Sequence, residues 1–357
     1  MQNFKIVELD NLEDKEFIED FIQYPYHVRR DPYRVGLMKE EQTRNLISWG
    51  HHHYSHFWLI KDNEDKILMR LSLRACPQLP DHGTIGFFET DLTDPRCQDV
   101  FNFCMEETQK WFKQKNVKSI IAPVDINTWF NYRFSLPSKR FWPRFKWEPT
   151  TPPEYLELFQ KNNYVDFARF NSVFFPKIKI GPFAPGTGHM KRSYKNLINL
   201  GFNLRPFDKE NFKTKELPVF YEISQEAFSD ALLFEPIDQE TFSNLYASAA
   251  AAYDFSPSCV ITDPCGEVAG FLFAFFDNDH LVIKSIALKR KYQGLRLSAG
   301  MIYSAVKLSY SLNKKFTVSA LVRTGLSSEK IAGNSQKWAW LNWSHDYVLV
   351  KKDISNE

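Results

Sequence analysis

The segment of the sequence best suited to chemistry is a basic turn in the C-terminal half. Apolar residues 286–288 lead into three consecutive cations at 289–291, and a helical pattern begins near Ser298. A turn from strand to helix points several free backbone N–H groups at one place, and the helix dipole adds positive potential there. Together with Arg296, these cations predict an anion-binding turn, and the alternative is a solvated, charged connection.

A loop in the N-terminal half gathers hydrogen-bonding and aromatic side chains. It follows a predicted buried strand, and loops at strand ends commonly carry binding residues. We expect substrate binding there, against the alternative of a rigid connection whose aromatic rings only pack. The candidates are Asp125, Asn127, Trp129, Tyr132 and Arg133, with Glu148 and Tyr155 from a proline-rich, extended path as further candidates.

Histidines at 51–53 and at 56 have the residue type of a zinc site, and His52 and His56 are spaced as on one helical face. Cys, Asp and Glu do not accompany them, so we expect a surface histidine run and no metal. The sequence contains no Ser-His-Asp order, nucleophile elbow, Walker motif or dinucleotide fingerprint. Hydrolase, kinase and Rossmann oxidoreductase activities are therefore not indicated.

The elements that must position these residues occur twice along the chain. In each half the hydrophobic pattern predicts strand, strand, strand, helix and strand, with Asp, Asn or Gly at the hairpin turns. The predicted elements are 57–61, 66–73, 84–90, 95–115 and 117–124 in the first half, and 259–262, 267–276, 280–288, 298–313 and 316–322 in the second. Helices at 15–23, 39–49, 219–228 and 239–253 precede the two sets, and Asp94 and Asp238 are expected N-caps.

This repeat predicts an α+β protein with two tandem domains, each a mixed, mostly antiparallel sheet flanked by helices. The chain of 357 residues exceeds the usual size of one domain. Residues 177–189 are rich in Pro and Gly and form the expected linker. The predicted domains are therefore 1–176 and 190–357.

The composition indicates which classes of partner the protein binds and in which cellular compartment we expect it. A net charge of +2 offers no basic surface to a nucleic acid, and the longest apolar run, 268–276, is too short to cross a bilayer. The five cysteines form no C-x-x-C pair, and the first residues do not resemble a signal peptide. We expect a cytoplasmic protein that acts on a small molecule, with neither a nucleic acid nor a membrane as partner.

The basic turn resembles the acyl-CoA loop of the GNAT superfamily of N-acyltransferases, whose pattern is (Q or R)-x-x-G-x-(G or A). The six matching positions are Gln293, Gly294, Leu295, Arg296, Leu297 and Ser298. Arg296 and Ser298 stand where the pattern has small residues, and glycine would let the backbone approach a phosphate closely. Segments 83–89, 122–133, 145–159 and 201–228 are also similar to bacterial tandem-GNAT proteins of unassigned substrate.

The resemblance implies an N-acyltransferase that moves an acyl group from acetyl-CoA or another acyl-CoA to the amine of a small molecule or amino-acid-like acceptor. It implies that the cofactor is held by the six turn residues and by Ile286 and Leu288 on the preceding strand. In the first half, residues 89–95 replace the turn, and their three carboxylates would repel a pyrophosphate. The cofactor is therefore expected in the second half alone.

Two groups that many GNAT enzymes use are missing from the matching positions. Val282 stands where the strand would carry a carboxylate, and Ile331 stands where a tyrosine acid would follow. Lys284 shares a strand face with Val282 by the two-residue period, which makes it a candidate for binding a substrate carboxylate. We assign no catalytic residue, and the alternative function is a non-catalytic protein that binds coenzyme A or a metabolite.

Overall fold

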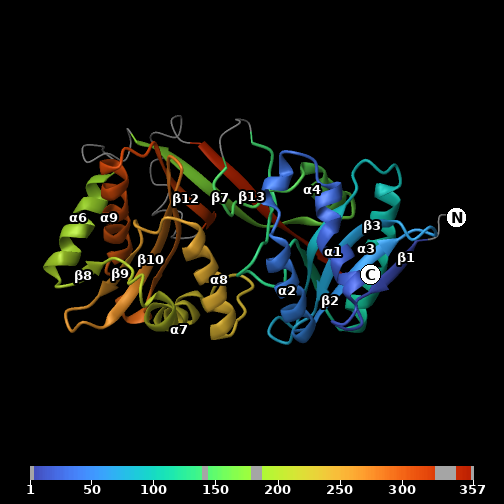
Figure 1. The fold of residues 1–357 in the computed structure, drawn as a ribbon, viewed down its shortest axis with the longest axis horizontal. Helices are drawn as coiled ribbons and strands as arrows, with labels where there is room; N and C mark the ends of the chain where they lie inside the picture. The colour runs from blue at the N-terminus through green and yellow to red at the C-terminus, as the bar shows by residue number, and fades with distance from the viewer. Residues whose placement is uncertain (1–3, 139–143, 178–186, 326–342, 355–357) are drawn as a thin grey trace. The chain divides into compact units, whose positions relative to one another are not determined.

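The computed structural model describes residues 4–138, 144–177, 187–325 and 343–354 (Figure 1). The chain divides into two compact units. Unit 1 contains Met1–Lys139, Trp147–Arg169 and Asp346–Glu357, and unit 2 contains Arg140–Lys146 and Phe170–His345.

Unit 1 is a mixed sheet covered by helices. Its elements are β1 (Lys5–Glu8), α1 (Lys15–Val28), η1 (Tyr33–Gly36), α2 (Glu40–His52), β2 (Ser55–Lys61), β3 (Ile67–Arg74), β4 (His82–Thr90), α3 (Cys97–Gln114), β5 (Ser119–Ala122), β6 (Phe134–Ser135), α4 (Pro153–Lys161) and part of β13 (Trp343–Asp353). The strand order is β1-β2-β3-β4-β5-β13, with β6 also beside β13. The pair β4–β5 is parallel, and the other described pairs are antiparallel.

Alternation along β2 explains how unit 1 acquires two cores. Successive side chains of a strand point to opposite faces of the sheet. Phe57 and Leu59 pack with residues of α1 and α2, whereas Trp58 and Ile60 pack with residues of α3 and α4. All four side chains are almost fully buried, so each face of the sheet supports one layer of helices.

Unit 2 repeats this plan. Its elements are part of β7 (Val165–Pro176), α6 (Gly188–Asn199), β8 (Asn203–Arg205), the π-helix η3 (Phe212–Glu216), α7 (Leu217–Phe228), α8 (Gln239–Ala252), β9 (Cys259–Thr262), β10 (Val268–Asp277), β11 (His280–Leu288), η4 (Arg290–Tyr292), α9 (Leu297–Ser311) and β12 (Phe316–Arg323). The strand order is β7-β12-β11-β10-β9-β8, with β11 and β12 parallel and the other pairs antiparallel.

The two faces of the unit 2 sheet also carry different helices. Phe271 on β10 stacks on Phe220 of α7 at 4.4 Å, while Leu272 faces the core formed with α6 and α9. Helices α6 and α9 run side by side (Figure 1). Gly300 permits this approach, because a Cβ atom there would lie 3.2 Å from the backbone of Tyr194 on α6.

Two strands begin in one unit and end in the other. Residues 170–176 of β7 pair with β12, whereas residues 350–353 of β13 pair with β5. The last described strand of the chain therefore completes the sheet of the N-terminal unit, although the sequence-based division assigns it to the domain 190–357. Sheet membership depends on a pairing partner far away in the sequence, which the local pattern does not reveal.

The predicted fold class and the repeated order of elements are confirmed by the structure. Asp238 accepts a hydrogen bond from the Thr241 N–H and caps α8 as predicted. The prediction that Asp94 caps α3 was wrong, because the helix begins at Cys97 and Asp94 holds the preceding turn. Of the expected linker, 178–186 lie outside the described residues. None of the described helices is both long and apolar enough to span a membrane.

Candidate functional site

The turn from β11 to α9 contains two residues in left-handed backbone conformations. Gly294 has φ +86°, which suits glycine, and Arg296 has φ +59° at the N-cap of α9. An arginine in this conformation is strained by roughly 1–2 kcal/mol. The position where the resemblance expects glycine thus has a backbone that glycine favours.

Several backbone N–H groups at this turn have no hydrogen-bond acceptor among the described residues. Tyr292 and Gln293 donate to Lys289 and Arg290, but the N–H groups of residues 294–296 have no acceptor among the residues that the structure describes. A Cβ atom at Gly294 would have no atom of the described residues within 4 Å, so none of them fills the space in front of this backbone. Open donors at the start of a helix form an anion-binding arrangement.

Most of the cations of the turn are already paired. Lys289 and Lys291 both contact Glu267, at 2.7 and 2.6 Å, and Arg290 contacts Asp230 at 3.1 Å. The charge that Arg290 and Lys291 were predicted to supply is therefore partly neutralised. Arg296 is exposed and forms no ion pair within the described part of the chain. It is the cation of the turn that remains available to a ligand.

The other predicted cofactor residues are placed by the strand and the helix. Ile286 and Leu288 are half-buried and pack against the core beneath α9. Leu297 is buried, Leu295 is exposed, and Ser298 occupies the first turn of α9. Gln293 donates its side-chain N–H to the Leu288 carbonyl at 3.2 Å. Ile286, Leu288 and Leu297 therefore offer a ligand mainly backbone groups.

Beyond their first residues, β11 and β12 separate. Their pairing covers 280–283 on β11 and 316–319 on β12. The register of β10 and β11 shifts at Lys284, because Phe273 lies opposite Ser285 and Ala274 lies opposite Ile283. The bulge breaks the two-residue period, so alternation from Val282 does not place Lys284 as the sequence analysis assumed.

Polar groups follow the bulge on β11. Val282, at the position where a carboxylate was missing, is fully buried, and Ile331 lies outside the described residues. Ser285 hydrogen-bonds the hydroxyl of Tyr246 on α8, and burial raises the pKa of Tyr246 to about 12. Tyr246 was not predicted, because nothing in the sequence of α8 distinguishes it from a core tyrosine.

The corresponding turn of unit 1 is closed by its own side chains. Asp91 accepts a hydrogen bond from the Thr93 N–H and Asp94 one from the Arg96 N–H, both at 2.9 Å. Arg96 forms ion pairs with Asp94 and Asp62, each at 2.9 Å. Glu89 does not point into this turn, because it is buried and forms an ion pair with Arg29. The prediction of three carboxylates that repel a pyrophosphate was therefore wrong for Glu89.

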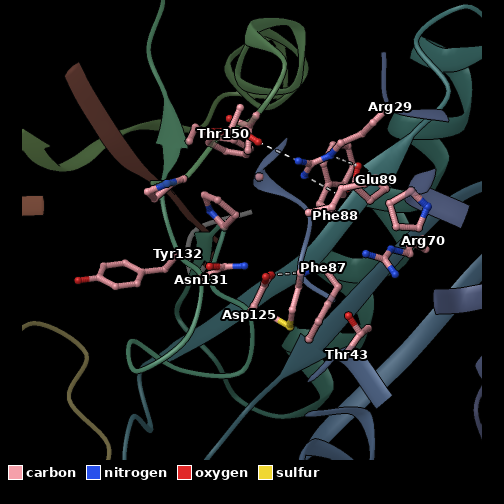
Figure 2. Close-up of a pocket in the computed structure, with 18 of the residues that line it drawn as sticks. Arg29, Thr43, Arg70, Phe87, Phe88, Glu89, Asp125, Asn131, Tyr132 and Thr150 are labelled. Carbon is pink, nitrogen blue, oxygen red and sulfur yellow. Dashed lines mark hydrogen bonds and ion pairs between the residues drawn. The ribbon is translucent and has the colours of Figure 1, made fainter. Parts of the chain in front are cut away.

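Unit 1 contains a cavity of about 70 Å³ at the end of β4 (Figure 2). The cavity has room for several water molecules, since one water needs roughly 10–15 Å³ by this measure. Side chains from α1, β3, β4 and the loop after β5 surround it. Its charged and polar lining residues are Arg29, Thr43, Arg70, Glu89, Asp125, Asn131, Tyr132, Arg133, Thr150 and Thr151.

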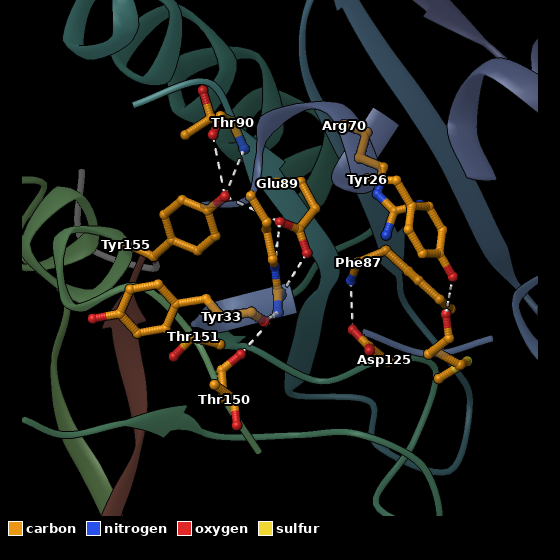
Figure 3. Close-up of polar contacts among 12 residues, drawn as sticks. Tyr26, Tyr33, Arg70, Phe87, Glu89, Thr90, Asp125, Thr150, Thr151 and Tyr155 are labelled. Atoms are coloured by element: carbon orange, nitrogen blue, oxygen red, sulfur yellow. Dashed lines mark hydrogen bonds and ion pairs between the residues drawn. The ribbon is translucent and has the colours of Figure 1, made fainter. Parts of the chain in front are cut away.

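One side of the cavity is a satisfied ion pair. Arg29 at the end of α1 donates to both oxygens of Glu89, at 2.8 and 2.6 Å, and to the Thr150 carbonyl at 2.8 Å (Figure 2). Tyr155 donates its hydroxyl hydrogen to Glu89 at 3.0 Å and lies near the Thr90 backbone (Figure 3). Both charged side chains are buried, so this network fixes the wall of the cavity.

The other charges of the cavity are less satisfied. Arg70 on β3 is 5% exposed, lies over the Phe21 ring, and donates to the Phe21 carbonyl, but its Nε atom is buried without an acceptor in the described structure. Asp125 accepts the Phe87 N–H at 2.5 Å (Figure 3). Burial raises the pKa of the Asp125 carboxyl to about 6, although the Phe87 N–H and Arg70 oppose the shift. Burial likewise lowers the pKa of Arg70 to about 10.

The structure separates the predicted loop residues into two groups. Tyr132 and Arg133 line the cavity, with the Arg133 guanidinium stacked on the Tyr132 ring at 3.7 Å. Asn127 is buried and accepts the Trp129 N–H at 3.0 Å, so these two shape the loop. Of the further candidates, Tyr155 reaches the cavity wall.

Glu148, the other further candidate, accepts a hydrogen bond from Tyr347 at 2.7 Å. The prediction of an extended path through Tyr155 was wrong, because α4 begins at Pro153. Sequence reasoning missed Arg29, Arg70 and the pairing of Glu89. An arginine inside the apolar strand 66–73 is the signal that could have drawn attention to Arg70.

The histidines of the run contact other side chains and backbone groups of the protein. His53 stacks on Trp49 and approaches its carbonyl at 2.6 Å, while His56 contacts Glu8 at 2.5 Å. Within the described residues, no group of three or more His, Cys, Asp or Glu side chains is placed to hold a metal ion.

Comparison with known proteins shows the fold. No protein-family model matches the sequence, and no curated protein does so either. A tandem GNAT protein from the clavulanic acid biosynthesis pathway is similar at TM-score 0.54 and 11% identity, over 99% of this chain and 100% of that one. A conserved protein of unknown function from Enterococcus faecalis V583, a probable N-acyltransferase, has TM-score 0.57 and 8% identity, over 99% and 72%.

A third structure, a GCN5-related N-acetyltransferase from Kribbella flavida, has TM-score 0.54 and 10% identity, over 99% of this chain and 72% of that one. At these identities the likeness concerns the fold. These structures indicate the same fold as the element order of each unit and the turn at the start of α9. The chain therefore has the tandem fold of the GCN5-related N-acetyltransferases.

Proposed function

We propose that the protein is an acyl-CoA-dependent N-acyltransferase whose cofactor binds at the turn between β11 and α9. The observation that carries the proposal is the set of open N–H groups at residues 294–296, beside a cation, Arg296, that no described carboxylate neutralises. A pyrophosphate requires such donors and positive charge. The matching turn of unit 1 has its donors capped by Asp91 and Asp94.

The residues of the turn fit the cofactor in three respects. The backbone at Gly294 is bare, so a phosphate can approach without meeting a side chain. The N–H groups of 294–296 would donate to phosphate oxygens, and Arg296 would supply charge. Bound there, acyl-CoA supplies an acyl group activated as a thioester.

The acceptor in this proposal is the amine of a small molecule. The net charge of +2 does not favour a nucleic acid as acceptor. A tyrosine is protonated at neutral pH, and burial raises the pKa of Tyr246 further, to about 12, so its hydroxyl is a neutral donor beside Ser285. Such a donor can stabilise developing negative charge, and holding two reactants together supplies much of the rate of a transfer. The five free cysteines support a reducing, cytoplasmic location.

One observation favours a second candidate, a non-catalytic protein that binds coenzyme A. Val282, at the position where many enzymes of this fold carry a carboxylate, is apolar and fully buried. Incubation of the protein and acetyl-CoA with a panel of amines distinguishes the two functions, because the transferase releases free thiol and the binding protein does not.

Calorimetric titration with acetyl-CoA and coenzyme A tests the cofactor site. We expect saturable binding to one site and at least a roughly tenfold weaker affinity in Arg296→Glu, since reversal of one contacting charge commonly changes binding by more than 1.4 kcal/mol. Lys307→Glu is the matched control: it lies exposed on α9, and ten residues of helix place it about 15 Å from the turn. Equal loss in both variants, or no binding by the wild type at millimolar ligand, would overturn the proposal.

A further inference from the structure

The cavity of unit 1 holds two opposite charges, Arg70 and Asp125, which attract each other and Glu89 or Arg29 across the cavity but form no direct ion pair among the described residues. Arg29 and Glu89 satisfy each other, but neither Arg70 nor Asp125 forms an ion pair with any residue that the structure describes. Burying a charge without a partner is costly, so such groups are uncommon unless something else compensates them. Their presence on one small cavity points to a ligand.

Arg70 is oriented to bind an anion. Among the described residues, Nη1 donates to the Phe21 carbonyl and Nε is buried without an acceptor and without access to the cavity, so Nη2 is the nitrogen left to bind a ligand. A guanidinium has five N–H donors in a planar fork that matches a carboxylate. The ring of Phe21 lies 4.7 Å from its central carbon and fixes the plane of the fork.

Asp125 is oriented to bind a cation. One oxygen accepts the Phe87 N–H, which leaves the second oxygen without a partner among the described residues. The bulge of β4 at Phe87, where φ is +50°, directs this N–H to the carboxylate and holds it in place. A carboxylate fixed in this way can accept hydrogen bonds from an ammonium group.

We propose that the cavity of unit 1 binds a small zwitterion of the amino-acid class, with its carboxylate on Arg70 and its ammonium on Asp125. The volume of about 70 Å³ admits a molecule of a few non-hydrogen atoms. Ile22, Leu37 and Met38 form an apolar part of the lining that suits a short aliphatic side chain. The site lies wholly in unit 1 and does not depend on binding of acyl-CoA to the turn of unit 2.

Titration of the full-length protein with each of the common amino acids at about pH 7.5 provides the first measurement, because Asp125 is then ionised. For the tightest amino acid, the amide removes the carboxylate charge and the deaminated acid removes the ammonium. We expect both analogues to bind at least about tenfold more weakly than the zwitterion, as each loses one charge-assisted contact. Equal affinity of the deaminated acid would reduce the site to an anion site and overturn the proposal.

Two variants locate the ligand. Arg70→Gln and Asp125→Asn are each expected to weaken binding at least about tenfold, and Arg44→Gln, which breaks an exposed ion pair with Glu19 on the neighbouring helix, leaves affinity unchanged. Arg70→Gln is judged only if its melting temperature is close to that of the wild type. Asp125→Asn keeps the shape and the acceptor for Phe87 and therefore tests the site even when the other variant unfolds.

The pH gives an independent readout. Affinity for the amino acid should fall as the pH is lowered from about 7.5 to about 5, because protonated Asp125 no longer attracts an ammonium. Arg29, Arg70, Glu89 and Arg133 are the charged groups that line the cavity with Asp125, and Asp125→Asn should abolish the dependence. Absence of binding by any amino acid up to about 10 mM, or retained affinity in Asp125→Asn, would refute the site, and either result would leave acetyl-CoA binding to unit 2 untouched.

Discussion

The two strand-to-helix turns have the same place in the fold and opposite chemistry. Between β4 and α3, Asp91 and Asp94 occupy the N–H groups of the turn, and Arg96 and Lys66 neutralise Asp94. Between β11 and α9, the N–H groups of 294–296 have no acceptor among the described residues. The first turn therefore satisfies these donors with its own side chains, whereas in the second no described side chain does so.

The strands beside these turns also differ in the groups that surround them, but here unit 1 is the one with charged groups that no described residue pairs directly. In unit 1 the bulge of β4 lies beside a cavity lined by Arg70 and Asp125, two charges that form no direct ion pair with any described residue. In unit 2 the bulge of β11 contains Lys284, and its neighbours Val282 and Tyr246 are apolar or neutral. A duplicated fold can thus keep its backbone and divide ligand chemistry between its copies, because loops and a few side chains decide what each copy binds.

The largest expected effect comes from breaking the ion pair that forms the wall of the unit 1 cavity. Glu89→Gln leaves Arg29 buried without a carboxylate, which should lower the free energy of unfolding by about 3–5 kcal/mol. Urea denaturation followed by fluorescence measures it. Glu19→Gln, which breaks an exposed ion pair with Arg44, serves as control and should cost at most about 1 kcal/mol. Similar costs for the two variants would show that the Arg29 network is not structural.

A smaller effect of opposite sign is expected at Asp125. The pKa of this carboxyl is raised to about 6 in the folded protein, so the folded state loses stability relative to the unfolded state as the pH rises from about 4 to about 6. Asp125→Asn removes that loss, and should stabilise the protein by up to about 3 kcal/mol near pH 8 and little near pH 4. Melting curves at both pH values test this. A variant less stable than the wild type near pH 8 would mean that the carboxylate is compensated by the protein.

The smallest effects are expected at the turn of unit 2. Arg296→Gly relieves a left-handed backbone and should stabilise the protein by up to about 1 kcal/mol, whereas Gly294→Ala should destabilise it by about 1 kcal/mol. Both should weaken acetyl-CoA binding, the first by removing charge and the second by adding a methyl group to the open space. Denaturation and titration of the same samples separate the two properties. Tighter binding in Arg296→Gly would show that the arginine obstructs the turn.

Strands with clear alternation or continuous apolar runs could be predicted almost to the residue. The predicted 259–262 and 280–288 coincide with β9 and β11. Strands β7 and β13 were not predicted, although β13 contains four consecutive buried residues, 347–350. Even with its strand character recognised, β13 could not have been assigned to the sheet of unit 1, because that pairing joins residues more than 200 positions apart.

The anion-binding turn could be located because strand, turn and helix follow one another within a short segment. Of the cavity of unit 1, the loop that carries Asp125, Tyr132 and Arg133 could be predicted, whereas Arg29 and Arg70 could not, since they come from separate elements that meet only in the folded sheet. Ion pairing within the protein was a further obstacle to predicting which cations a ligand can use. Sequence alone counts Arg290 and Lys291 as cations for a ligand, whereas the structure commits them to Asp230 and Glu267.

The exchange of strands between the units has a consequence for biosynthesis. Domains usually fold in order as the ribosome releases them, N-terminal first. The pairing of β5 requires residues 350–353, whereas the strand order of unit 2 from β7 to β8 needs no strand after β12, which ends at Arg323. Unit 2 can therefore assemble its sheet while unit 1 is still incomplete, and a nascent chain released after residue 345 would leave an unpaired strand edge in the half that was translated first.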